Sequence, residues 1–64
     1  MNNLKFKRKS RRLTQKEVAR LLNMSTPTYI KKEHNLDYFR IYEAMELADI
    51  LECDIDYLFN KNTI

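Results

Sequence analysis

Thr26, Thr28 and Lys31 place two hydroxyl groups and an ammonium group close together, beside the only proline, Pro27. If this stretch is helical, the side chains lie in its first two turns. Short polar groups at the end of a helix can reach the hydrogen-bonding edges of bases in the major groove of DNA. They can equally be ordinary first-turn residues, because hydroxyl side chains are common where helices begin. The elements that position them therefore decide the interpretation.

The 64-residue composition excludes most catalytic chemistry. There is no glycine, so the glycine-rich loops that bind nucleotide phosphates are missing. One histidine and one cysteine, Cys53, provide neither a structural metal site nor an internal disulfide. A chain this small rarely encloses a substrate pocket. We therefore expect no enzyme, no metal, no cofactor and no small-molecule ligand.

Charge is divided unevenly along the chain. Residues 1–35 carry ten lysine and arginine residues against two acidic residues, a formal charge of +8. Residues 36–64 carry two basic residues against seven acidic residues, a formal charge of −5. The basic half favours a polyanionic partner, which the acidic half would repel. No signal-peptide pattern and no apolar run long enough to span a membrane occur in the sequence, so we expect a cytoplasmic location.

The second and third helices have the clearest start signals. The pattern Thr14-x-x-Glu17 is a capping box, which predicts a helix that begins after Thr14 and ends near Asn23. Ser25 is a natural N-cap for the next helix, with Pro27 in its first turn. The third helix is expected to bury Tyr29 and to end at residues 34–35.

The rest of the chain also favours helix, because glycine is absent and leucine, glutamate, lysine and alanine are frequent. We predict a first helix over residues 3–11, a fourth over residues 40–51 and a fifth over residues 55–59. Residues 36–40 are ambiguous, and Asp37 is a candidate cap there. The side chains expected to point inward from the fourth and fifth helices are Ile41, Ala44, Leu47, Ala48, Leu51, Ile55 and Leu58.

A link of about three residues forces the second and third helices to cross steeply, which predicts a helix-turn-helix over residues 14–34. Residues 13–25, LTQKEVARLLNMS, resemble the LTQxELAxxLGVS signature of the Cro and phage-repressor type of helix-turn-helix protein, the Xre family. Residues 28–35, TYIKKEHN, are similar to the third helix of that family, and residues 47–59, LADILECDIDYLF, to its closing motif. With Leu4 and Arg8, the resemblance covers residues 4–59.

The resemblance implies an all-α, compact, five-helix, lambda-repressor-like domain over residues 1–64. It implies a sequence-specific regulator of transcription, a Cro-like repressor that binds a duplex DNA operator as a homodimer. The implied base contacts are Thr26, Pro27, Thr28 and Lys31. The implied phosphate contacts are Gln15, Lys16, Lys32, His34, Asn35 and Arg40. It also implies a buried ion pair between Arg8 and Glu33.

The chain departs from the family pattern at several positions. Asn23 and Asn35 stand where the family has glycine, and both keep a residue that tolerates positive φ. Arg12 occupies a third common glycine position. Lys32 stands where the family often has a large apolar residue. Pro27 replaces a hydrogen-bonding side chain and leaves an apolar surface that could meet a thymine methyl group.

A second interpretation keeps the fold and changes the partner. The chain would then be a protein-interaction module, such as an antitoxin or an anti-repressor, whose acidic half and surplus aromatic residues form the active surface. Leu36, Tyr38, Phe39 and Tyr42 exceed what a core of this size needs. They are either core residues or part of a dimer interface, and the sequence favours neither.

Overall fold

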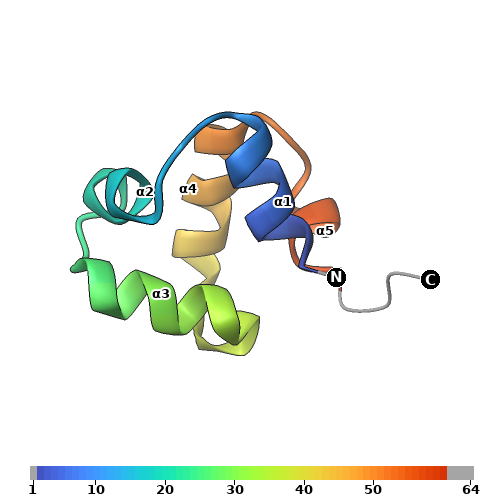
Figure 1. The fold of residues 1–64 in the computed structure, drawn as a ribbon. Helices are drawn as coiled ribbons and strands as arrows, with labels where there is room; N and C mark the ends of the chain where they lie inside the picture. The colour runs from blue at the N-terminus through green and yellow to red at the C-terminus, as the bar shows by residue number, and fades with distance from the viewer. Residues whose placement is uncertain (1, 61–64) are drawn as a thin grey trace.

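Five α-helices and one short 3₁₀ helix make up the computed structural model, which describes residues 2–60 and contains no strand among them (Figure 1). The helices are α1 (Asn3–Ser10), α2 (Gln15–Leu21), α3 (Thr26–His34), the 3₁₀ helix η1 (Leu36–Tyr38), α4 (Ile41–Leu51) and α5 (Ile55–Leu58). The all-α prediction is confirmed, and each α-helix begins and ends within two residues of its predicted limits, with the largest difference at the end of α2. Residue 1 and residues 61–64 of the expected domain lie outside the described residues.

Side-chain caps start α2 and α3 where the sequence predicted them. The Thr14 hydroxyl accepts a hydrogen bond from the Glu17 N–H at 3.0 Å, and the Glu17 carboxylate accepts one from the Thr14 N–H at 2.8 Å. The hydrogen bond from the Thr14 N–H lowers the pKa of the Glu17 carboxyl, and the nearby Thr14 hydroxyl lowers it further. The Ser25 hydroxyl accepts the Thr28 N–H at 3.3 Å, and Pro27 lies in the first turn of α3. Local hydrogen bonds therefore define both helix starts.

A residue with left-handed backbone follows three of the helices, α1, α2 and α4. Arg12, Asn23 and Glu52 have φ angles of 60°, 59° and 53°, although none is glycine. The prediction of a similar conformation at Asn35 is wrong, because its φ angle is −134°. The Asn35 side chain instead accepts the Asp37 N–H at 3.2 Å and caps η1, so Asp37 is not the cap expected there. Because η1 begins at Leu36, directly after Asn35, Asn35 caps the next helix and does not adopt the left-handed conformation that would end α3.

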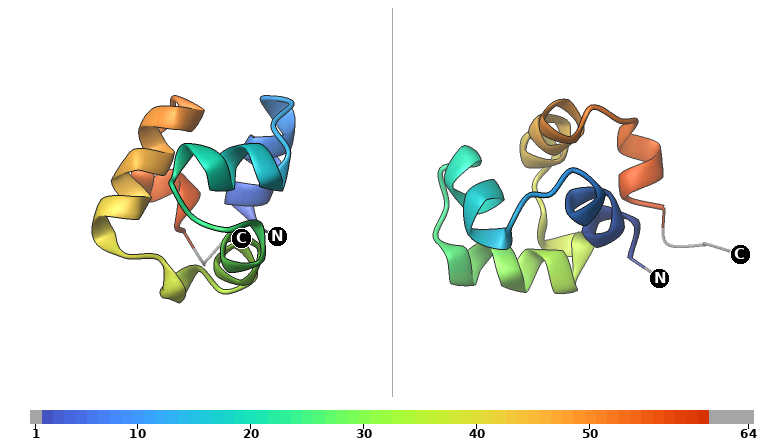
Figure 2. Two further views of the ribbon diagram at one scale, coloured as in Figure 1. Left: turned by 90° about the vertical axis from the view of Figure 1, so that its left-hand side faces the viewer. Right: turned by 45° about the horizontal axis from the view of Figure 1, so that its top comes forward.

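A fully buried side chain from each of the five α-helices meets in one core. In the left view of Figure 2, α4 lies on one side, α1 on the other and α2 between them, above the end of α3. The core residues with no exposed surface are Leu4, Val18, Tyr29, Leu47, Leu51 and Leu58. Because α3 contributes Tyr29 to this core, its opposite side is left at the surface.

The structure divides the surplus aromatic residues between core and surface. Leu36 and Phe39 are half-buried against the core, and the Phe39 ring meets the Tyr29 ring edge-to-face at 6.0 Å. Tyr38 and Tyr42 are exposed. Neither of the two expectations, core or interface, therefore covers all four residues.

The inward row of α4 differs from the predicted one. Ile41, expected in the core, is 81% exposed, whereas Glu43 is buried together with Ala44 and Leu47. The inward direction in the first turn of α4 therefore passes between Glu43 and Ala44, which turns Ile41 outward. In α5, Ile55 is half-buried rather than buried.

Candidate nucleic-acid interface

α2 and α3 form a helix-turn-helix. In Figure 1, α2 is seen nearly along its axis and α3 from the side, so the two helices cross steeply. Residues 22–25 connect them, and the Leu22 and Met24 N–H groups both donate to the Ala19 carbonyl, at 3.1 and 3.0 Å. Val18 and Ala19 pack into the core on the inner side of this pair. The pair thereby presents the first turns of α3 at the surface.

The expected base-contacting residues gather on the outer side of α3. Pro27, Thr28 and Lys31 are exposed, and Thr26 is half-buried. The Thr28 hydroxyl accepts a hydrogen bond from the Ser25 hydroxyl at 2.8 Å. Tyr38 of η1, which the sequence did not single out here, lies beside them. A cavity of about 260 Å³ is lined by Pro27, Thr28, Lys31, Lys32 and Tyr38. Thr26 lies apart from it and lines the groove between α2 and the start of α3.

The expected phosphate contacts do not form one cluster. Gln15 and His34 line an open cavity of about 320 Å³ together with Lys5, which sequence reasoning missed. Lys16 instead lines a separate groove of about 650 Å³ between α2 and the start of α3. Asn35 and Arg40 are exposed near η1, and Lys32 is half-buried. Lys5 gave no signal of its own because it begins a basic run that continues with Lys7, Arg8 and Lys9.

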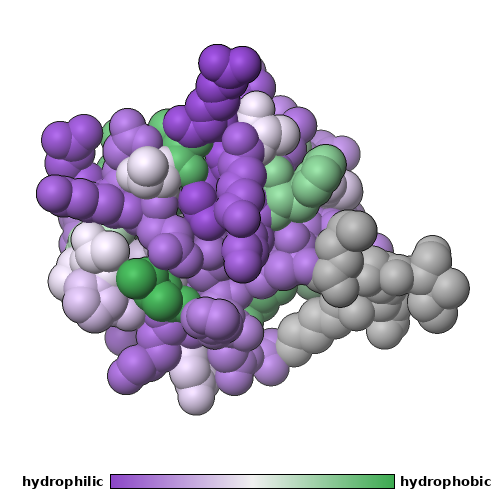
Figure 3. All heavy atoms as spheres, in the orientation of Figure 1, coloured by the Kyte–Doolittle hydropathy of each residue, from purple (hydrophilic) through white to green (hydrophobic). Residues whose placement is uncertain are grey.

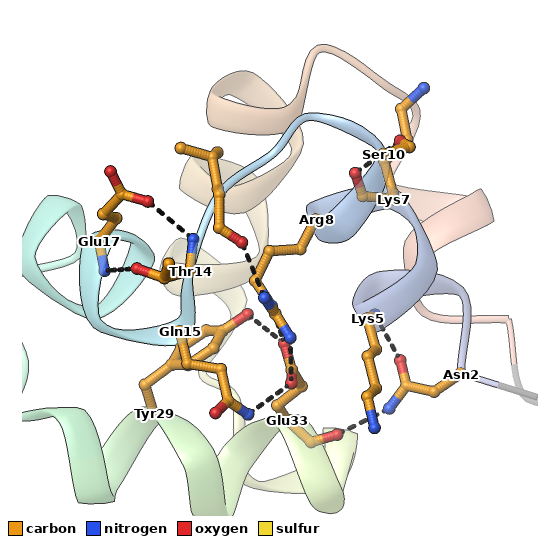
Figure 4. A network of polar contacts seen from close by, with 11 residues as sticks. Asn2, Lys5, Lys7, Arg8, Ser10, Thr14, Gln15, Glu17, Tyr29 and Glu33 are labelled. Carbon is orange, nitrogen blue, oxygen red and sulfur yellow. Dashed lines mark hydrogen bonds and ion pairs between the residues drawn. The ribbon is translucent and has the colours of Figure 1, made fainter.

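A buried ion pair holds the end of α3 against α1, as the resemblance implied (Figure 4). Arg8 Nε donates to Glu33 Oε2 at 2.7 Å, and Arg8 Nη2 donates to Glu33 Oε1 at 3.2 Å. The third guanidinium nitrogen, Nη1, donates to the Leu13 carbonyl at 2.8 Å. This bidentate geometry, with two parallel N–H···O bonds, is the strong form of an arginine–carboxylate contact.

Two further side chains donate hydrogen bonds to the Glu33 carboxylate. Tyr29 Oη donates to Oε2 at 2.7 Å, and Gln15 Nε2 donates to Oε1 at 2.9 Å. α1, α2 and α3 therefore meet on one carboxylate, which we call the Glu33 network: Arg8, Gln15, Tyr29 and Glu33. The four-residue spacing of Tyr29 and Glu33 was a signal for their contact. Nothing in the sequence signalled the contact between Gln15 and Glu33.

The Glu33 network keeps its charges ionised in the interior. Burial raises the pKa of the Glu33 carboxyl, but hydrogen bonds from Arg8, Tyr29 and Gln15 outweigh it and hold this pKa below its ordinary value. Burial lowers the pKa of the Arg8 guanidinium, and the contact with Glu33 reverses that effect and raises it. Burial and the adjacent carboxylate raise the pKa of the Tyr29 hydroxyl, so it remains a donor.

Asparagine side chains at the start of α1 add two contacts across the fold. Asn2 Nδ2 donates to the Glu33 carbonyl at 2.7 Å, and Asn3 Nδ2 donates to the Tyr57 carbonyl at 2.9 Å. The first contact fastens α1 to the last turn of α3, and the second fastens α1 to α5. Sequence reasoning missed both, because neither partner is a side chain.

A second ion pair holds the other side of α3, where Lys32 had been expected to reach phosphate. Lys32 Nζ lies 2.7 Å from Glu43 Oε1 and 2.9 Å from Oε2, and its side chain is 15% exposed. The Arg40 N–H also donates to Glu43 Oε1 at 2.9 Å. Burial raises the pKa of the Glu43 carboxyl, and the contacts with Arg40 and Lys32 lower it overall. The first turn of α4 thus neutralises Lys32 within the chain.

Hydrophilic side chains cover most of the face that carries α1, α2 and α3, which Figure 3 shows in the orientation of Figure 1. Among residues 2–60, no three histidine, cysteine or acidic side chains gather closely enough to hold a metal ion. None of the described helices has the length and apolar character needed to cross a membrane.

Comparison with known proteins agrees with this geometry. A family model described as helix-turn-helix matches residues 4–58. No curated protein and no solved structure matches the chain. The family match runs from the first turn of α1 to the end of α5, with the crossing helices α2 and α3 at its centre. The chain therefore belongs to the helix-turn-helix family of DNA-binding proteins.

Proposed function

We propose that this protein is a sequence-specific regulator of transcription that binds duplex DNA and acts as a Cro-like repressor. One observation carries the proposal. The Glu33 network and the core hold the inner side of α3, so the side that bears Pro27, Thr28 and Lys31 is exposed and fixed in orientation. A rigid helix with short side chains in its first turns suits the major groove.

The phosphate backbone would be held on both sides of α3. Gln15, His34 and Lys5 surround one open cavity near the end of α3, and exposed Arg40 follows η1, next to the start of α4. Lys16 and Asn35 extend this set. The charge of +8 over residues 1–35 supports such contacts, because cations that replace condensed counterions provide most of the nonspecific affinity for DNA. Lys32, with its charge paired to Glu43, contributes least.

A salt titration tests the proposal against the protein-interaction alternative. If one chain neutralises ~4–6 phosphates, the logarithm of the DNA association constant falls with a slope of about −4 to −5 against the logarithm of the salt concentration. Fluorescence anisotropy with a labelled duplex measures this slope. No duplex binding, or a slope near zero, would contradict the proposal and favour an antitoxin-like or anti-repressor-like partner protein.

Substitutions on α3 test the proposed division between base and phosphate contacts. Thr28→Ala and Lys31→Ala are expected to relax preference at one position of the binding site, each by ~1–3 kcal/mol. Gln15→Ala is expected to weaken all duplexes alike, because a phosphate contact carries no sequence information. Lys9→Ala on α1 removes the same charge as Lys31→Ala and serves as the control. Selection from a random duplex pool with each variant measures the preferences.

We further propose that two copies bind one operator through the outer face of α4. Ile41, Tyr42 and Met45 are all more than half exposed, although each is a large apolar or aromatic residue. Exposed apolar residues clustered on one helix mark interaction surfaces. Ile41→Lys is expected to make the protein monomeric in sedimentation and to abolish binding to palindromic duplexes at low protein concentration. Leu21→Lys, an exposed apolar position on α2, is the control.

A further inference from the structure

The cavity between α3 and η1 includes Tyr38, a residue outside the expected base contacts. We infer that it receives the C5-methyl group of a thymine in the major groove, and that Tyr38 is the wall that makes this contact specific. The inference rests on the proposed binding of duplex DNA. It assigns a base to the site and adds a residue that lies outside α3.

The cavity lies where a base edge would arrive. Pro27, Thr28 and Lys31 line it from the exposed side of α3, and Tyr38 lines it from η1. Tyr38 is 55% exposed, so its ring is available as a wall and is not part of the core. The cavity volume of about 260 Å³ exceeds that of one methyl group and leaves room for the edge of the base that carries it.

The second ion pair removes the charge of Lys32 from one wall of the cavity. Lys32 lines the cavity, but its ammonium group is held 2.7 Å from the Glu43 carboxylate and lies 6.0 Å from the centre of the Phe39 ring. A lysine fixed by its ammonium group presents the methylene stem along its length. Lys32 can therefore form an apolar wall although it is a charged residue.

The polar groups at the edge of the cavity select a base rather than a lipid or an apolar peptide. Lys31 is exposed, and Thr28 carries its hydroxyl beside its own methyl group. Pro27 has no side-chain hydrogen-bonding group and no N–H, so it offers only apolar surface. In the major groove, thymine is the one standard base with a methyl group, which distinguishes it from cytosine at the same position.

A methyl contact and a phosphate contact at Tyr38 predict different results. If the hydroxyl of Tyr38 donated to a phosphate, Tyr38→Phe would weaken every duplex and Tyr38→Ala would do the same. If the ring contacts a methyl group, Tyr38→Phe keeps the contact and Tyr38→Ala removes it. The two substitutions therefore separate the ring from its hydroxyl.

The test uses the full chain and a duplex recovered by selection from a random pool. Each thymine is replaced in turn by deoxyuridine, which lacks only the C5-methyl group. Deoxyuridine is expected to weaken binding about fourfold at one position of each half-site, the effect of one buried methyl-sized group. Tyr38→Phe is expected to keep this penalty, and Tyr38→Ala to lose it. Tyr57→Ala, an exposed tyrosine on α5, is the matched control and is expected to keep it.

Each other result overturns the inference. It fails if the duplex binds and no deoxyuridine position shows a penalty, or if the penalty persists in Tyr38→Ala. It also fails if Tyr38→Phe weakens all duplexes, which would indicate a phosphate contact. Loss of all duplex binding in the salt titration would refute the proposed function together with this inference. If Tyr38→Ala does not fold, Pro27→Ser removes the opposite wall, and an unchanged penalty there counts against the site.

Discussion

Two neighbouring residues, Lys32 and Glu33, hold the same helix from opposite sides, and they do so by different means. Glu33 is 3% exposed and receives side-chain donors from α1, α2 and α3 itself. Lys32 instead binds Glu43, which is 6% exposed and accepts hydrogen bonds from the Lys32 ammonium group and one backbone N–H. The contacts of Glu33 form a hydrogen-bonded network, which apolar side chains cannot replace. The contact between Lys32 and Glu43 is a point contact at the edge of the core.

The difference shows which side of α3 is fixed most firmly. A network with donors from three helices defines both the position and the rotation of α3, because each donor has its own direction. A single lysine ammonium group has rotatable donors and imposes less direction. We therefore expect the α1 side to control whether α3 presents its outer face correctly. The α4 side adjusts the cavity next to it.

Breaking the Glu33 network is expected to have the largest effect. Arg8→Ala or Glu33→Ala leaves one buried charge without its partner, which costs ~3–5 kcal/mol. The double variant is expected to lose clearly less than the two single variants together. Urea unfolding followed by circular dichroism measures the cycle, with Glu33→Gln as a milder substitution if Glu33→Ala does not fold. Additive losses would show that the two residues do not interact.

Removing only the Tyr29 hydroxyl tests the same network with less damage. Tyr29→Phe keeps the buried ring and deletes one donor to the carboxylate, which is expected to cost ~1.5–3 kcal/mol. The control is Tyr57→Phe, which deletes a hydroxyl from a partly exposed tyrosine and is expected to change stability little. Equal losses in the two variants would contradict a special role for the Tyr29 hydroxyl.

Acid is expected to weaken the two sides unequally. The pKa values of Glu33 and Glu43 lie below their ordinary values in the folded protein. Their contributions are therefore complete above the unfolded pKa of ~4.3 and are lost as the pH falls through the folded values. Below pH ~4.5, we expect Glu33→Gln to flatten the fall of stability more than Glu43→Gln does, because Glu33 has more donors. Thermal unfolding across this range checks the order.

Replacing the second pair by apolar residues is expected to have the smallest effect. Lys32→Leu with Glu43→Leu restores a residue type common at the Lys32 position in the family, and we expect stability within ~1 kcal/mol of the original or higher. The equivalent exchange of Arg8 and Glu33 is expected to be destabilising, because Tyr29 loses its acceptor. Unchanged salt dependence of DNA binding in the Lys32 variant would confirm that its charge makes no phosphate contact.

The helix starts were predictable because their causes are local. Thr14 with Glu17, and Ser25 with Thr28, are three residues apart, so their hydrogen bonds depend on the chain within one turn. The core stripe of α2 followed from helical periodicity in the same way. The prediction of left-handed backbone at Asn35 was wrong, because the conformation of Asn35 depends on how soon the next helix begins.

The all-α architecture, the helix-turn-helix and the basic half of the chain could be predicted, because helix propensity, capping and charge are properties of short segments. The partners that long side chains reach depend on how the helices pack. Gln15 meets Glu33 and Lys32 meets Glu43 across 18 and 11 residues of sequence. The packing of α1 and α4 against α3 fixes those distances, and no local pattern encodes them. The same packing turned Ile41 outward and brought Tyr38 beside α3.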